Sequence, residues 1–120
     1  MTNFAAMLPQ VDVIIPALNE AESLPHVLRA LPWVRIRSVI VVDNGSTDGS
    51  LTGIEDLSGV KVIRTGRNLG FAAACNIGAA EGDSPYILFL NPDTRLETNS
   101  LTVPLSFMER RENANVGICG

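Results

Sequence analysis

Short apolar runs separated by polar turns set the pattern of this 120-residue chain. Five of the runs have few polar interruptions and many β-branched residues, which is typical of strands buried in a sheet. They cover residues 11–15, 38–42, 60–63, 86–90 and 116–119. The run at 38–42 is nearly all β-branched, so we expect both of its faces to be covered.

Apolar residues at helical spacing predict a helix after the first strand. The residues that would form its buried face are Leu24, Val27, Leu28 and Leu31. Asn19 is predicted as its N-cap, because Glu22 three residues later completes an approximate capping box. Pro32 would end the helix.

Two further helices complete the pattern. Asn68 is predicted to cap an alanine-rich helix that runs to about residue 81, and residues 101–111 predict another. Strands that alternate with helices through short connections indicate βαβ units and a mostly parallel sheet. We therefore expect residues 1–120 to form a single α/β domain.

Composition and charge narrow the class of protein. A hydrophobic fraction of 46% argues against disorder, and a net charge of −4 argues against a general nucleic-acid binder. No apolar run is long enough to span a bilayer, and residues 1–4 lack the start of a secretion signal. Cys75 and Cys119 do not have the spacing of a zinc knuckle, so a reduced cytosolic compartment is a simpler interpretation than a disulfide.

Polar loops follow four of the predicted strands, at residues 16–20, 43–48, 64–68 and 91–93. In a parallel sheet the strand-to-helix loops share one edge, where ligands bind, so these loops are expected to converge. Each loop alone has an ordinary explanation as a turn. Four polar loops on one edge are together typical of a nucleotide site.

Individual residues in these loops leave alternatives open. Asp43 is suited either to accept the imide N–H of a pyrimidine base or to close a turn, whereas Asp48 is expected in the first turn of a helix. Arg67, close to Arg64, has three possible roles. It would neutralise a phosphate, form an ion pair with Asp43 or Asp93, or be a solvated surface residue. Asp93 would hold a divalent cation against a diphosphate, or simply close a turn after a buried strand.

Several common motifs are absent from the sequence. The first strand is not followed by a glycine-rich dinucleotide fingerprint, and there is no P-loop lysine, which counts against a nicotinamide dehydrogenase and an NTPase. There is no serine nucleophile elbow. His26, the single histidine, is expected on the surface of the first helix.

Taken in order, residues 11–20, 41–50, 67–76 and 89–94 resemble the family 2 glycosyltransferases with the GT-A fold. The resemblance implies a three-layer α/β/α sandwich, and transfer of a sugar from a nucleotide-diphosphate donor with inversion. By resemblance, Pro16, Ala17 and Glu20 line the base and ribose, and Asp43 with Asn44 reads the base.

The same resemblance assigns the remaining site residues. Arg67 would lie near the donor, together with Asn91, and Asp93 would be the final acid of the family's Asp-x-Asp motif, which binds Mg or Mn. The first acid of that motif is Asn91 here, which removes one negative charge. The sequence at 91–94 resembles the rhamnosyltransferase-like branch, whose donor is dTDP-rhamnose, whereas residues 16–24 resemble polyprenyl-phosphate sugar transferases.

In this family the acceptor site and the general base lie beyond the metal motif, so the resemblance predicts an incomplete GT-A domain that supplies the donor and metal half. The partners implied are a nucleotide-diphosphate sugar and a glycan or lipid-linked acceptor, in the cytoplasm or at the inner face of a membrane. The predicted last strand would leave an exposed sheet edge, which favours self-association. A noncatalytic nucleotide-binding or scaffold module is the alternative, and a nucleotidyltransferase would need a glycine-rich loop that is missing.

Overall fold

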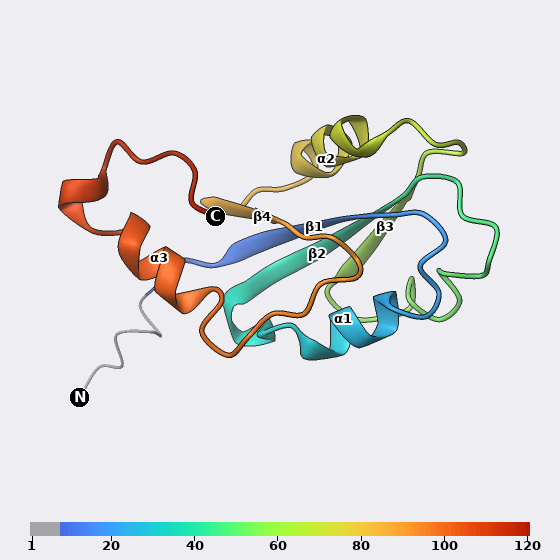
Figure 1. Ribbon diagram of the computed structural model, residues 1–120, viewed down its shortest axis with the longest axis horizontal. Coiled ribbons are helices and arrows are strands. Elements are labelled where there is room, and N and C mark those ends of the chain that lie inside the picture. Colours follow the sequence, from blue (N-terminus) through green and yellow to red (C-terminus); the bar gives the residue numbers. More distant parts are fainter. Residues whose placement is uncertain (1–7) are drawn as a thin grey trace.

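The computed structural model describes residues 8–120 and is built around a parallel sheet. Its strands are β1 (Val11–Ala17), β2 (Ile36–Asp43), β3 (Val60–Arg64) and β4 (Tyr86–Phe89). They lie in the order β3–β2–β1–β4, and every neighbouring pair is parallel (Figure 1). The prediction of an α/β fold with a mostly parallel sheet is confirmed.

Helices cover both faces of the sheet. Helix α1 (Leu24–Ala30) lies on one face and α2 (Phe71–Ala80) on the other (Figure 1). Helix α3 (Thr102–Met108) contributes Leu105 to the same core as α1, and short 3₁₀ turns occupy Trp33–Arg35 and Arg111–Asn113. The larger core joins alternate β1 and β2 residues to α1, while the smaller one joins the opposite face to α2.

Gly78 explains how closely α2 approaches the sheet. A Cβ atom at this position would lie 2.3 Å from Ile14 Cγ2 and 3.0 Å from Val42 Cγ2. Only a residue without a side chain fits there, because interiors are close-packed. The small-residue composition of this helix therefore sets the spacing between α2 and the strands that carry the site.

The predicted strand at 116–119 is wrong. These residues form no strand in the described part of the chain, so β4 is an edge strand of the sheet. An apolar run has the composition of a strand, but a strand also needs a backbone partner, which local sequence does not specify. Cys119, at the end of this run, is an exposed free thiol, whereas Cys75 is a buried one within α2.

The predicted helix caps are also wrong. Ser23, not Asn19, precedes α1, and Gly70, not Asn68, precedes α2. Asn68 Oδ1 instead accepts a hydrogen bond from the Gly70 N–H at 2.9 Å and closes a turn. Asp48 is not in a first helical turn, because residues 44–59 form bends and turns without a helix.

No helix in the described range 8–120 has the length and apolarity needed to cross a membrane. The expectation about a secretion signal at residues 1–4 lies outside the described residues.

Candidate functional site

Hydrogen bonds join the loops that follow β1, β2 and β3. The Asn44 N–H donates to the Ala17 carbonyl at 2.8 Å, and the Thr65 N–H donates to the Asp43 carbonyl at 3.0 Å. The Asn19 N–H donates to Ser46 Oγ at 2.9 Å. Three of the four polar loops therefore meet at the carboxyl edge of the sheet, whereas the sequence predicted that all four would converge there.

Asn19 connects the first two loops in both directions. Its Oδ1 accepts a hydrogen bond from the Thr47 N–H at 2.8 Å, and its φ of 55° lies in the left-handed region. Asparagine is among the few residues that tolerate this conformation, so it takes a loop role instead of the predicted cap. Asp48 and Ser50 add acceptors for the Ala21 and Glu20 N–H groups. These hydrogen bonds between the loops were not predicted, and the hydroxyl- and acid-rich run at 46–50 is their only local signal in the sequence.

Asp43 is buried, with 5% of its surface exposed, at the end of β2. Its Oδ1 accepts a hydrogen bond from the Ser46 N–H at 3.0 Å, which is the turn that the sequence analysis gave as one alternative. Among the described residues, no hydrogen bond reaches its other oxygen, Oδ2. The turn therefore uses half of the carboxylate and leaves the other half able to accept a ligand N–H.

Asn44 braces the third loop. Its Nδ2 donates to the Gly70 carbonyl at 3.2 Å, and its Oδ1 accepts from Thr65 Oγ1 at 3.3 Å and from the Leu69 N–H at 3.4 Å. The side chain is buried at 5% exposure, so these partners satisfy an amide that would be costly to leave unpaired. Asn44 thus fixes the β3–α2 loop relative to Asp43.

The other predicted donor residues of the first loop are in or next to β1. Pro16 and Ala17 are buried and pair with Val42 and Asp43 in the register of the sheet. The Glu20 carboxylate accepts a hydrogen bond from Ser23 Oγ at 2.6 Å and so holds the start of α1. Ala17 is thus the neighbour of Asp43 across the sheet, whereas the Glu20 side chain contacts the start of α1.

A hollow opens beside Asp43 on the side of the sheet that carries the larger core. Residues of the loops after β2 and β3 line it: Asp43, Gly45, Ser46, Thr47, Gly49, Ser50, Leu51, Thr52, Glu55, Arg64 and Gly66. Arg67 is exposed and forms no ion pair with Asp43 or Asp93, so that alternative is wrong. Gly45 has φ +93°, and a Cβ there would lie 3.1 Å from Arg67 Cα, so the two loops approach closely at this point.

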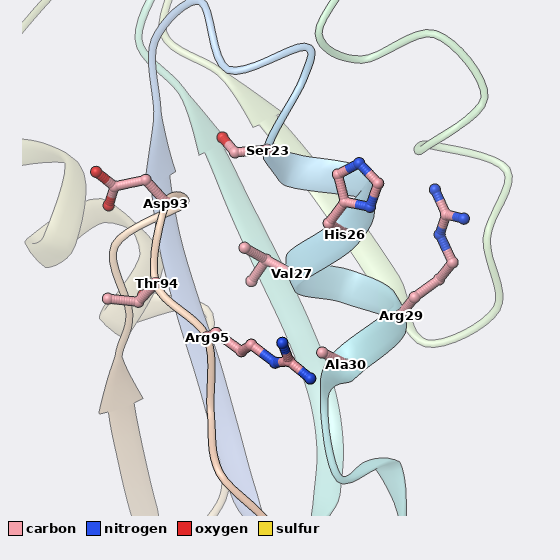
Figure 2. Close-up of a pocket in the computed structure, with 8 residues that line it drawn as sticks. All are labelled: Ser23, His26, Val27, Arg29, Ala30, Asp93, Thr94 and Arg95. Carbon is pink, nitrogen blue, oxygen red and sulfur yellow. The ribbon is translucent and has the colours of Figure 1, made fainter.

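Asp93 lies in a different hollow. It lines a space next to α1 with Ser23, His26, Val27, Arg29, Ala30, Thr94 and Arg95 (Figure 2). Strand β4 leaves the sheet early, because Phe89 pairs with Ile14 whereas β1 continues to Ala17. The fourth loop is therefore not hydrogen-bonded to the other three among the described residues. In Figure 2 the Asp93 carboxylate points away from α1.

Thr94 closes the turn that presents Asp93. The Thr94 N–H donates to the Asn91 carbonyl at 3.2 Å, and Thr94 Oγ1 donates to the same carbonyl. Asn91 and Asp93 are both exposed, so their side chains are available to a ligand. His26 is exposed on α1, as predicted.

The sequence profile of glycosyl transferase family 2 matches residues 12–119. The chain belongs to this family. Among curated relatives, it is 35% identical over 91 residues to an uncharacterized glycosyltransferase of Mycobacterium tuberculosis, covering 76% of this chain and 40% of that protein. It is 32% identical over 94 residues to glycosyltransferase AglJ of Haloferax volcanii, covering 77% and 30%. The chain thus spans less than half the length of these relatives.

Solved structures share the fold of this family 2 member. Mannosyltransferase PcManGT from Pyrobaculum calidifontis, solved with GDP-Man and Mn2+, superposes with a TM-score of 0.78 at 20% identity, covering 92% of this chain and 35% of that one. S. aureus TarS residues 1–349 give a TM-score of 0.73 at 23% identity, covering 83% and 32%. The expected GT-A arrangement of a parallel sheet between helices is confirmed.

The side chains around Asp93 determine whether this site could hold a divalent metal ion. Within residues 8–120, no group of three or more histidine, cysteine or acidic side chains forms a cage for a metal ion. Asp93 offers one exposed carboxylate with the amide of Asn91 nearby in sequence. One carboxylate is sufficient for Mg²⁺ or Mn²⁺ only when ligand phosphates supply further oxygens. The donor set therefore fits a cation that arrives with a diphosphate.

Proposed function

We propose that this chain is the donor-binding part of an inverting glycosyltransferase, which transfers a sugar from a nucleotide-diphosphate donor to a glycan or lipid-linked acceptor. One observation carries the proposal: Asp43 is buried, and its Oδ2 accepts no hydrogen bond from any described residue. It lies among three interlocked loops at the carboxyl edge of a parallel sheet. Such an edge is where open α/β sheets bind nucleotides. Residues 1–120 would form one nucleotide-sugar-binding domain.

In this proposal Asp43 accepts an N–H of the base. Pro16, Ala17 and Glu20 line the base and ribose. Arg67, which is exposed and forms no ion pair with another described residue, lies near the donor phosphates. Asn44, assigned by resemblance to the base, holds the third loop in place through its bonds to Gly70 and Leu69. A nucleotide sugar is elongated with chemically different ends, which is consistent with separate hollows beside Asp43 and Asp93.

Asp93 and Asn91 would hold a divalent cation, Mg or Mn, together with the donor diphosphate. Such a cation supplies charge stabilisation for the diphosphate that leaves. The mannosyltransferase PcManGT was solved with Mn2+ and GDP-Man, which supports this choice of ion class. The turn at 91–94 favours a deoxysugar donor of the dTDP-rhamnose type, as in the rhamnosyltransferase-like branch.

The proposed location of the protein is the cytoplasm or the inner face of the membrane, which follows the family pattern.

A noncatalytic nucleotide-binding module is the second candidate. It is favoured by Asn91, because the amide leaves the turn with one acid in place of two. The two candidates differ in chemistry: an enzyme part contributes to release of sugar from the donor, whereas a module binds the nucleotide without turnover.

Calorimetric titration of UDP, dTDP and GDP into the 120-residue chain, with and without Mn²⁺, tests the proposal. We expect Asp93→Ala to remove the gain in affinity from Mn²⁺ while leaving metal-free binding intact. Asp56→Ala, which removes an exposed acid outside both hollows, is the matched control. Folded protein that binds none of the nucleotides would overturn the proposal, and binding without sugar release in a longer form would favour the module.

A further inference from the structure

The hollow beside helix α1, here termed the α1 hollow, has two arginines and a histidine in its walls. His26 and Arg29 come from α1, and Arg95 comes from the segment that follows Asp93 (Figure 2). Asp93 is the single acid among the described residues that line this hollow. The chain as a whole has a net charge of −4, so the α1 hollow reverses the sign of charge that the composition would give it.

Neither arginine is neutralised within the described part of the chain. The ion pairs there are formed by three other cations: Arg37, Lys61 and Arg64. The Arg95 side chain has no hydrogen bond or ion pair with any described residue. Arg29 Nε donates to the Pro25 carbonyl at 3.3 Å, which leaves both of its Nη groups available to a ligand. Two unpaired cations that line one hollow repel each other, and an anion between them would remove that repulsion.

Asp93 does not supply the missing negative charge. It forms no ion pair with Arg29 or Arg95. In Figure 2 its carboxylate points away from α1, whereas the Arg95 side chain extends toward Ala30. Leu96 packs against the larger core and so anchors the backbone next to Arg95. The acid and the arginine are therefore presented to different sides of the turn.

A phosphoryl group matches these donors better than a carboxylate does. Guanidinium groups bind both kinds of anion through paired hydrogen bonds. A carboxylate has one charge and two oxygens in a plane, so a single arginine satisfies it. A phosphomonoester carries a charge of about −1.5 to −2 near pH 7 and three acceptor oxygens. It therefore matches two arginines and the ring N–H of a histidine together.

We propose that the α1 hollow binds a phosphoryl group, either as free phosphate or as the end of a phosphorylated molecule. Arg29 and Arg95 donate to its oxygens from the two walls, and His26 adds a further donor from α1. The site is additional to the proposed donor contacts at Asp43 and Asp93. It holds whether or not the chain transfers a sugar.

The test is a titration of inorganic phosphate into the isotope-labelled full chain, followed by NMR of the backbone amides. We expect the largest shifts at residues 26–30 and 93–96. Arg95→Gln and Arg29→Gln should each weaken phosphate binding by roughly tenfold, because each removes a charged hydrogen-bond donor. Arg95→Lys, which keeps the charge but loses the planar fork, should give an intermediate affinity. Both arginines are exposed, so these variants are expected to fold, which circular dichroism checks.

Arg111→Gln is the matched control, because it removes an exposed arginine that lines neither the α1 hollow nor the hollow beside Asp43. A loss in this variant equal to that in Arg95→Gln would indicate general charge attraction and overturn the inference. Acetate that binds as tightly as phosphate would also overturn it. Glycerol 3-phosphate distinguishes the two sources: tighter binding than phosphate identifies a phosphorylated molecule, and equal or weaker binding identifies free phosphate.

Nucleotides separate this site from the proposed donor site. We expect UDP, dTDP and GDP with Mg²⁺ to leave phosphate bound, and Arg95→Gln to bind them as the unaltered chain does. Displacement of phosphate by a nucleotide would place these arginines in the donor site and overturn the inference. Nucleotide binding without phosphate binding would overturn the inference alone, and phosphate binding without nucleotide binding would overturn the proposed function alone.

Discussion

Arg37 Nη2 donates a hydrogen bond to Asp12 Oδ2 at 2.8 Å and forms an ion pair with it at the amino end of the sheet. Asp12 is fully buried, and it also accepts hydrogen bonds from Ser38 Oγ and from the Asp83 and Ser84 N–H groups, at 2.8, 2.7 and 2.9 Å. One carboxylate thus joins the starts of β1 and β2 to the loop before β4. Burial raises the pKa of Asp12, but these donors outweigh it and hold the pKa well below the ordinary 3.8.

Replacing Asp12 is expected to be among the most damaging substitutions in the chain. Asp12→Ala leaves two backbone N–H groups and a hydroxyl without their acceptor, and should lower the free energy of unfolding by about 3 kcal/mol. Urea denaturation followed by circular dichroism measures this loss. Arg37→Ala should cost less, because Arg37 is 43% exposed and the other donors to Asp12 remain. Equal losses for both variants would show that the ion pair alone accounts for the effect.

Acid should weaken the fold through the same residue. The pKa of Asp12 is lower in the folded chain than its ordinary 3.8, so its contribution is complete above that value and falls as the pH drops toward the folded pKa. The difference in unfolding free energy between the unaltered chain and Asp12→Ala is therefore expected to be constant near neutral pH and to shrink below about pH 4. Denaturation at a series of pH values tests this. A difference that grows in acid would contradict the assignment.

Gly45 is expected to be required where its loop approaches Arg67. Gly45→Ala introduces both an unfavourable positive φ and a Cβ 3.1 Å from Arg67 Cα, whereas Gly66→Ala has φ +81° and a Cβ with no described atom within 4 Å beyond its own residue and chain neighbours. Backbone strain alone should cost about 1 kcal/mol at either site, and Gly45→Ala should cost clearly more. Denaturation measures the loss in free energy of unfolding for each variant. Nucleotide titration measures whether the change also alters binding at the hollow beside Asp43. Equal losses of stability in the two variants would contradict a role for the close contact between Gly45 and Arg67.

The open edge of the sheet should promote self-association. Ile87 and Phe89 of β4 remain 40% and 49% exposed, on the face where α2 covers β1 and β2. Exposed apolar edge strands pair with other chains, and a lysine on the edge discourages this. We expect association of the unaltered chain in light scattering at high concentration, and dispersal by Phe89→Lys. Val34→Lys, at another exposed apolar residue, is the control, and a monodisperse unaltered chain would contradict the prediction.

The sheet and its helices were predictable because their signals are local. The β-branched run within β2 is buried on both faces, and the alanine-rich segment became α2, so composition and periodicity decided these elements. The order of the strands was not available from such signals. Strand β4 pairs with β1, distant in sequence, and the apolar run at 116–119 has no strand partner in the described chain.

The candidate site was predictable in its residues but not in its connections. Asp43 was expected at a strand end and lies there, since every parallel strand delivers its carboxyl end to the same edge. The roles of Asn19 and Asn44 depend on hydrogen bonds to loops 21 or more residues away, which no local pattern encodes. The ion pair between Glu55 and Arg64 was not predicted either, because the two residues lie in different elements.

The Asp12 cluster has a consequence for how this scaffold can change. It binds the strands at the amino end of the sheet, whereas the loops at 45–52 and 64–67 lie at the opposite end. A mutational library confined to those loops would leave unaltered the carboxylate that holds the strand starts together, and under the proposed function it would vary nucleotide preference. Under the proposed function, donor preference could therefore change at loop positions that do not interlock the loops while the strand starts stay joined.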